Sequence, residues 1–178
     1  MRNQFFKLFI PGLLMAAFIL SCTPGAETPV DNTAEIQALI DKNLEIWNNG
    51  NMDLVAELYA DNFVREAPNG TQRGLDEFKA VVEGNRASFP DFRVEITDLM
   101  VKGDEFYVQW KTTGTNTGPL GENIPATGKT INNTGFSKVT LQEGKIVKEV
   151  VMWDQLGSNM QLGFTLVPPQ IEAETPEE

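Results

Sequence analysis

The spacing of the apolar residues changes once along this chain, and that change restricts the fold more than any other feature. From residue 34 to residue 89, most apolar residues recur every three or four positions, as on one face of an α-helix. From residue 92 to residue 153 they alternate with polar residues, as on one face of a β-strand. Helices followed by strands predict an α+β domain, in which an antiparallel sheet packs one face on the helices.

Three helices are predicted in the first part of the chain. The apolar residues of the longest one recur at helical spacing, with Asn32 and Glu35 placed as a capping box at its start: Ala34, Ile36, Leu39, Ile40, Leu44 and Trp47. A shorter helix is expected at about residues 52–59, before a brief strand at about residues 63–66. The third helix begins at "GLDEF" and ends before Pro90.

Four antiparallel strands are predicted in the second part, at about residues 92–100, 106–111, 130–141 and 145–153. The turns "KGDE" and "QEGK" join them in pairs, and the long loop "GTNTGPLGENIPATGK" separates the pairs. A strongly bent sheet of this kind, wrapped on three helices, forms a cone whose open mouth is a pocket.

The first residues have the pattern of an export signal. Two basic residues, Arg2 and Lys7, precede an apolar stretch that is too short to span a bilayer as a mature helix. Ser21 and Cys22 follow, and this order resembles the lipobox of bacterial lipoproteins. The resemblance implies cleavage before Cys22, acylation of its thiol by a fatty acid such as palmitate, and anchoring to a membrane of the bacterial cell envelope. An ordinary secretory leader that ends near an unrelated cysteine is the alternative.

These patterns divide the chain into four parts. Residues 1–21 are the predicted signal peptide, and residues 22–32, rich in Pro, Thr and acidic residues, are a predicted tether. Residues 33–166 form the predicted domain. The proline-rich, acidic tail at residues 167–178 is predicted to be disordered.

Composition excludes several classes of function. The formal net charge of −11 argues against nucleic acid as a partner, because phosphate binding needs clustered Lys and Arg. The 178 residues include no histidine, which excludes histidine-based metal sites and serine or cysteine nucleophiles activated by histidine. Acid–base chemistry would therefore use Asp, Glu, Tyr, Lys or water.

A single carboxylate, Asp154, follows the last predicted strand. If it continues the inner face of that strand, it lies beside Met152 and opposite Phe106, Val108 and Trp110. Removal from water would then raise its pKa and make it a proton shuttle for carbon acids next to carbonyls. The alternative is that Asp154 ends the strand and caps the turn "DQLGSN".

Four segments together resemble the SnoaL-like polyketide cyclase and ester cyclase family of the nuclear transport factor 2 superfamily: "WNNGNMDLVAELYADNFV", "SFPDFRVEI", "GTNTGPLGENIPATGKT" and "EGKIVKEVVMWDQLGSNMQLG". The resemblance spans about residues 34–164. It implies a cone-shaped α+β fold with a deep hydrophobic pocket, a homodimer, and no metal or organic cofactor. It also implies that Asp154 is the general acid/base of an intramolecular aldol closure.

Two positions differ from the family pattern. Members usually read Gly-Thr-His-Thr-Gly where this chain reads "GTNTG", so Asn116 replaces a histidine. Its amide could donate a hydrogen bond to a developing enolate oxygen, or Asn116 could be only a turn residue. Members also often have histidine after the short strand, where this chain has Arg65 and Glu66. Arg65 could bind a substrate carboxylate, or it could balance a surface acid such as Glu66.

Aromatic residues could line the pocket for a flat or apolar ligand, or they could be ordinary core residues: Trp47, Tyr59, Trp110, Phe136 and Trp153. Phe106 and Met152 are further candidates for substrate contacts. Two functional hypotheses follow. The chain is either a membrane-tethered cyclase or isomerase that acts on a small hydrophobic carbonyl compound through Asp154, or a noncatalytic module that binds a small ligand or a partner at the cell envelope.

Overall fold

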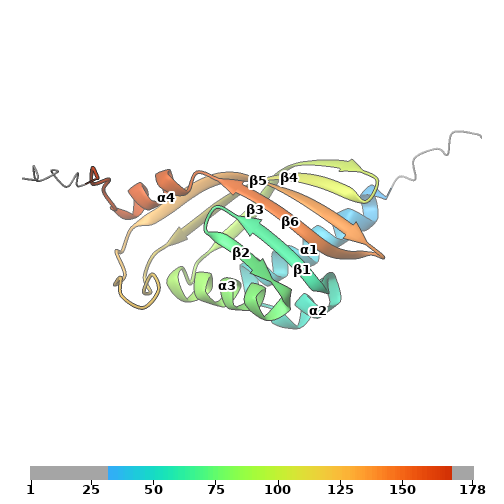
Figure 1. Ribbon diagram of the computed structural model, residues 1–178, viewed down its shortest axis with the longest axis horizontal. Helices are drawn as coiled ribbons and strands as arrows, with labels where there is room; N and C mark the ends of the chain where they lie inside the picture. Colours follow the sequence, from blue (N-terminus) through green and yellow to red (C-terminus); the bar gives the residue numbers. More distant parts are fainter. Residues whose placement is uncertain (1–31, 170–178) are drawn as a thin grey trace, which may run out of the picture.

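The computed structural model describes residues 32–169, which form a strongly curved, unclosed sheet packed on helices (Figure 1). The predicted signal peptide, the predicted acylation site Cys22, and most of the predicted tether and tail lie outside these residues. In chain order the elements are α1 (Thr33–Asn49), the 3-10 turn η1 (Met52–Leu54), α2 (Val55–Leu58), β1 (Tyr59–Ala67), β2 (Gly70–Arg73), α3 (Gly74–Ser88), β3 (Arg93–Lys102), β4 (Glu105–Thr115), β5 (Thr130–Gln142), β6 (Lys145–Trp153) and α4 (Gln155–Leu162). None of the helices within residues 32–169 combines the length and apolar character needed to cross a bilayer.

The sheet contains the predicted antiparallel meander and two further strands. Its order is β2-β1-β6-β5-β4-β3, and the pairs from β3 to β6 are antiparallel. The expected short strand is the nine-residue β1, which adds to the sheet parallel to β6 and forms a hairpin with β2. The purely antiparallel sheet of the prediction is therefore wrong at this one pairing, and β2 was not predicted.

Two helical predictions are confirmed in position. α1 runs from Thr33 to Asn49, and the left-handed φ of 72° at the next residue, Gly50, stops the helix. Its predicted capping box is wrong, because the side chain of Asn32 makes no capping bond and instead donates to the carbonyl of Gly103. α3 runs to Ser88, so the helix ends shortly before Pro90 as expected.

The helices cover the concave face of the sheet. α1 packs against β3, and α3 packs against β1 and β2, while the long strands arch over them (Figure 1). The main core lies between these layers and is rich in aromatic and branched residues, including Ile36, Tyr59, Phe63, Phe78 and Phe106. A smaller core consists of Phe89, Phe92, Ile131 and Leu162, the last residue of α4.

β3 contains a bulge that reverses its alternation. Ile96 pairs with Trp110, whereas Asp98 pairs with Gln109, so Thr97 is one extra residue in β3. After the bulge Leu99 and Val101 pack against the main core, while Met100 is exposed. Simple alternation from Ile96 would place Asp98 and Met100 on the same face as Ile96, and the bulge places them on the opposite face.

A second bulge, in β6, also reverses the alternation of its strand. Leu141 pairs with Ile146, whereas Thr140 pairs with Lys148, so Val147 is the extra residue. Ile146 is buried before the bulge, and Glu149, Val151 and Trp153 line the interior after it. Since one extra residue exchanges the two faces of a strand, Lys148 and Met152 point outward rather than inward.

Candidate functional site

A cavity of about 750 Å³ opens between the concave face of the sheet and the helices. Its walls are mostly apolar, and α4 contributes Gln155, Ser158, Asn159 and Leu162 to the lining. Among the described residues that line it, only Arg65 and Glu149 carry a charge. A cavity of this size and character suits a drug-sized organic ligand with few polar groups.

Most of the predicted aromatic wall is confirmed. Trp47, Tyr59, Phe106, Trp110 and Trp153 all line the cavity. Two other candidates lie on the opposite face of the sheet, where Phe136 on β5 pairs with Met152 on β6. These two side chains are 58% and 61% exposed, so the prediction that Phe136 and Met152 line the pocket is wrong.

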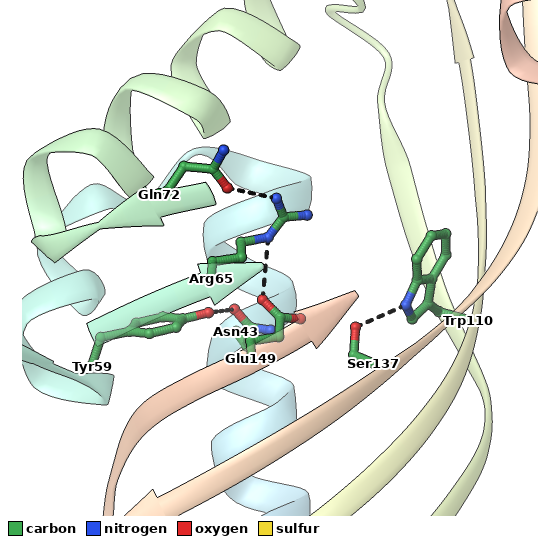
Figure 2. A network of polar contacts seen from close by, with 7 residues as sticks. All are labelled: Asn43, Tyr59, Arg65, Gln72, Trp110, Ser137 and Glu149. Carbon is green, nitrogen blue, oxygen red and sulfur yellow. Dashed lines mark hydrogen bonds and ion pairs between the residues drawn. The ribbon is translucent and has the colours of Figure 1, made fainter. Parts of the chain in front are cut away.

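The Trp110 side chain lies against a glycine. A Cβ atom on Gly135 would come within 2.3 Å of two indole carbons, so β5 can pass beside the indole only without a side chain at that position. The indole N–H donates to Ser137 Oγ at 3.1 Å (Figure 2). Gly135 and Ser137 therefore fix the position of this aromatic wall.

The charged end of the cavity consists of two residues that face each other across β1 and β6. Arg65 and Glu149 are direct partners in the parallel register, and Arg65 Nε lies 3.3 Å from Glu149 Oε2. The two side chains are 7% and 13% exposed. Neither of these two atoms makes a hydrogen bond within the described residues, so charge attraction holds this contact.

Further contacts orient the guanidinium of Arg65. Nη1 donates to Gln72 Oε1 on β2 at 3.0 Å (Figure 2). The guanidinium carbon lies 5.8 Å from the ring centre of Trp47. The expected surface pair of Arg65 with Glu66 is wrong. Glu66 instead pairs with Lys148, on the exposed side of the same two strands.

Tyr59 supplies a buried phenol near this pair. Its hydroxyl donates to Asn43 Oδ1 at 2.7 Å, and its ring packs on Phe63 and Phe78. Burial raises the pKa of Tyr59 well above its usual value, and the nearby Glu149 raises it further, while Arg65 lowers it. Tyr59 is therefore a neutral hydrogen-bond donor in the physiological range.

Asp154 lies outside the cavity. Its side chain is exposed and accepts a hydrogen bond from the Gly157 amide at 2.7 Å, which makes it the N-cap of α4. The expected inward position beside Met152 is wrong, because the β6 bulge reverses the strand face before Asp154 is reached. The capping alternative is confirmed, although the cap begins a helix rather than a turn.

Asn116 is fully buried in the loop after β4, and its amide is already satisfied. Nδ2 donates to the carbonyls of Ser88 and Gly118, and Oδ1 accepts from the amide and the hydroxyl of Thr127. Asn116 does not line the cavity. The expected donation to a substrate oxygen is therefore wrong in this structure, where Asn116 ties the long loop to α3.

Sequence reasoning missed Glu149, the carboxylate that does face the cavity. The residue follows Lys148 in an apolar strand, and simple alternation from Ile146 assigns it to the outer face. The parallel pairing with β1, which opposes Glu149 to Arg65, is the signal that identifies it. Asn43 and Ser137, which line the cavity, and Gln72, which accepts a hydrogen bond from Arg65, were missed because each is an ordinary polar residue until the fold places it.

The arrangement has the parts needed for acid–base chemistry on an apolar compound. Glu149 offers a carboxylate, while Arg65 offers donors for a developing negative charge. Residues 32–169 contain no group of three or more acidic or cysteine side chains placed to hold one metal ion. The carboxylate and the guanidinium that face the cavity are suited to moving protons and to binding oxygen atoms.

Comparisons with known proteins agree with this architecture. The family model described as SnoaL-like polyketide cyclase matches residues 37–162. TsrD from Streptomyces laurentii is similar in structure, with a TM-score of 0.66 and 23% identity over 73% of this chain and 96% of TsrD. IdmH from Streptomyces antibioticus gives a TM-score of 0.63 and 24% identity over 72% of this chain and 98% of IdmH.

A third solved structure shares the fold at a lower sequence identity. A protein from Catenulispora acidiphila with a ketosteroid isomerase-like fold, in complex with trimethylamine, gives a TM-score of 0.61. It is 14% identical over 73% of this chain and 97% of its own length, so it shares the fold alone. No curated protein is similar enough in sequence to count as a match.

Proposed function

Because this chain belongs to the SnoaL-like polyketide cyclase family, we propose that its cavity binds a small hydrophobic carbonyl compound and catalyses a proton transfer on it. The reaction would be an aldol-type ring closure or an isomerisation, since both begin with loss of a proton next to a carbonyl. The observation that carries the proposal is the placement of one carboxylate and one guanidinium at one end of an otherwise apolar cavity.

Glu149 is the proposed general base. It accepts the proton from the carbon next to the substrate carbonyl and later returns a proton, so that no cofactor is consumed. Arg65 donates to the carbonyl oxygen as negative charge develops on it. Asp154, which the family resemblance suggested for this role, has its carboxylate on the surface and bonded to Gly157.

Deuterium exchange tests this proposal without knowledge of the natural substrate. The full mature protein is incubated in heavy water with a bicyclic aryl ketone such as tetralone, and NMR follows deuterium entry next to the carbonyl. We expect Glu149→Gln to slow the protein-catalysed exchange by about a hundredfold or more. Asp154→Asn should leave the rate unchanged, because an amide also accepts the capping bond.

The proposal fails if the wild-type protein does not accelerate exchange. It also fails if Asp154→Asn abolishes exchange while Glu149→Gln, shown to be folded by its circular dichroism spectrum, retains it.

A noncatalytic binding module is the second candidate. It is favoured by the pairing of the two charged cavity residues with each other, which leaves no carboxylate of the lining unpaired. It is also favoured by the absence of the histidines usual in the family. This alternative predicts tight binding of an apolar ligand, without exchange, in both the wild type and Glu149→Gln.

A homodimer is proposed as the assembly state. Four large side chains on the convex face of the sheet are exposed. They lie in two cross-strand pairs, Met100 with Tyr107 and Phe136 with Met152, with Gln109 and Lys138 between the pairs. Burial of these side chains against a second copy would remove them from water. We expect Phe136→Lys to shift the protein from dimer to monomer in sedimentation experiments; an unchanged sedimentation coefficient would contradict this interface.

Membrane anchoring through Cys22 is proposed from the sequence alone. The basic start, the short apolar stretch and the Ser21-Cys22 order support export followed by lipidation on the cysteine thiol. Labelling of cells with a palmitate analogue should mark the wild-type protein and not Cys22→Ser. Equal labelling of both would exclude acylation at this residue.

A further inference from the structure

The Arg65–Glu149 pair presents one donor and one acceptor to the cavity. Nη1 of Arg65 is engaged by Gln72, and Nε lies beside Oε2 of Glu149. The remaining atoms, Arg65 Nη2 and Glu149 Oε1, make no hydrogen bond with any residue that the structure describes. Figure 2 shows both pointing toward the side of the cavity where Trp110 and Ser137 lie.

These two atoms belong to a buried side chain, that of Arg65, and to one that is 13% exposed, that of Glu149. Arg65 is 6% exposed, and a charged donor in such surroundings favours a ligand that completes its hydrogen bonds. The free carboxylate oxygen of Glu149 likewise favours a ligand group that donates a hydrogen bond to it. A ligand group that satisfies both atoms must therefore accept a hydrogen bond from the guanidinium and donate one to the carboxylate at the same time.

We propose that this end of the cavity recognises a neutral hydroxyl group, such as a phenol, an alcohol or the enol form of a ketone, and discriminates against carboxylates. The hydroxyl oxygen accepts from Arg65 Nη2, and its hydrogen is donated to Glu149 Oε1. An ether or ketone satisfies only the arginine. A carboxylate has no hydrogen to donate and also meets the negative charge of Glu149.

The rest of the cavity limits the ligand to an apolar, ring-bearing molecule. Trp47 lies beneath the guanidinium, and Trp110 forms the wall toward which the two free atoms point. A volume of about 750 Å³ exceeds what a single ring fills, so a hydroxylated compound of two or more fused rings fits the site. This inference rests on the proposed use of the cavity as a binding site and names the functional group that it selects.

Binding of three matched probes tests the inference. The full mature protein is titrated at neutral pH with naphthol, with its methyl ether and with naphthoate, and the dissociation constants are measured by calorimetry or by quenching of tryptophan fluorescence. We expect naphthol to bind about tenfold or more tightly than either of the others, because only naphthol completes both hydrogen bonds.

Two glutamate variants make the test specific to the cavity. Glu149→Gln should reduce the preference for naphthol over naphthoate, because it removes the negative charge from the cavity. Glu66→Gln is the matched control, since Glu66 lies on the neighbouring strand and pairs with Lys148 on the exposed side. It should leave all three constants unchanged.

Naphthoate binding as tightly as naphthol, equal binding of all three probes, or no binding of any probe would overturn the inference. The wild-type comparison alone gives these results, so the test does not depend on the folding of a variant. The exchange experiment gives an independent answer. A protein that shows the hydroxyl preference without catalysing exchange would refute the proposed reaction and support the inference, and the opposite result would do the reverse.

Discussion

At the scale of single residues, two ion pairs between β1 and β6 allow a direct comparison. Arg65 and Glu149 pair on the inner face with little exposure, whereas Glu66 and Lys148 pair on the outer face and are each about half exposed. Water screens the outer pair, so its contribution to stability is small. Both members of the inner pair have lost much of their hydration, so each depends on the other for compensation.

Removal of one member of the inner pair should therefore be costly. We expect Arg65→Gln to lower the free energy of unfolding by about 3–5 kcal/mol, because the charge of Glu149 is left uncompensated in the cavity wall. The double variant Arg65→Gln, Glu149→Gln should lose less than the sum of the single variants. Urea unfolding of the four proteins in this cycle measures the coupling, with Glu66→Gln as the exposed control. Additive losses would show that the pair is not coupled.

Tyr59 gives a prediction in alkaline solution. Its pKa is raised in the folded state, mainly by burial, so the folded protein favours the neutral phenol. The resulting stabilisation is fully present below the unfolded pKa of about 10 and is lost as the pH rises through the folded pKa. In a Tyr107→Phe background, which leaves Tyr59 as the only tyrosine, the free energy of unfolding should fall more steeply above about pH 10 than in the same background with Tyr59→Phe. Equal slopes would contradict this.

At the scale of elements, the β6 bulge decides which carboxylate faces the cavity. Without Val147 as an extra residue, regular alternation from Ile146 would point Lys148, Val150 and Met152 inward and lead to Asp154. With it, Glu149 faces Arg65 and Asp154 is free to begin α4. One local irregularity therefore exchanges the inner and outer faces of the last strand.

The N-cap of α4, formed by the side chain of Asp154, can be tested. Asp154→Ala removes the acceptor of the Gly157 amide, which costs about 1 kcal/mol at a typical N-cap and should speed hydrogen exchange of that amide about fivefold. Asp154→Asn retains an acceptor and should exchange like the wild type. If neither substitution changes the exchange rate, the carboxylate does not cap α4.

Gly135 provides a test of the aromatic wall. Its replacement by alanine would place a methyl group within 2.3 Å of the Trp110 indole and 2.6 Å of the Met152 carbonyl oxygen, so the indole must move. We expect Gly135→Ala to cost about 1–3 kcal/mol of stability and to shift the tryptophan emission. Gly84→Ala on α3 is the matched control, because no atom lies within 4 Å of its added Cβ. A neutral Gly135→Ala would contradict the contact.

The same elements show what could be predicted from the sequence. α1, α3 and the strands β3–β6 were predicted because each has a local apolar period. β2 was missed because "GTQR" has no such period and becomes a strand only by pairing with β1. The bulges at Thr97 and Val147 have no local signature either. Simple alternation therefore gives the wrong inner face beyond them, as it did for Met152 and Asp154 at the end of β6.

At the scale of the whole molecule, the cone and its apolar cavity were predicted, whereas the polar chemistry inside the cavity was not. Curvature and aromatic walls follow from the order of elements and from Trp47 and Trp110, which periodicity already placed on inner faces. The Arg65–Glu149 pair depends on the parallel contact of strands that are far apart in the chain. Neither local pattern nor family resemblance contains that contact.

Glu149, paired with Arg65, is the carboxylate of the cavity, while Asp154 lies on the surface. Carboxyl footprinting distinguishes the two: the folded protein is treated with a water-soluble carbodiimide and an amine, and mass spectrometry follows the labelling of each acidic residue over time. We predict rapid labelling of Asp154 and of the exposed reference Glu66, and slow labelling of Glu149 that an apolar cavity ligand slows further. Rapid labelling of Glu149 together with protection of Asp154 would contradict the account.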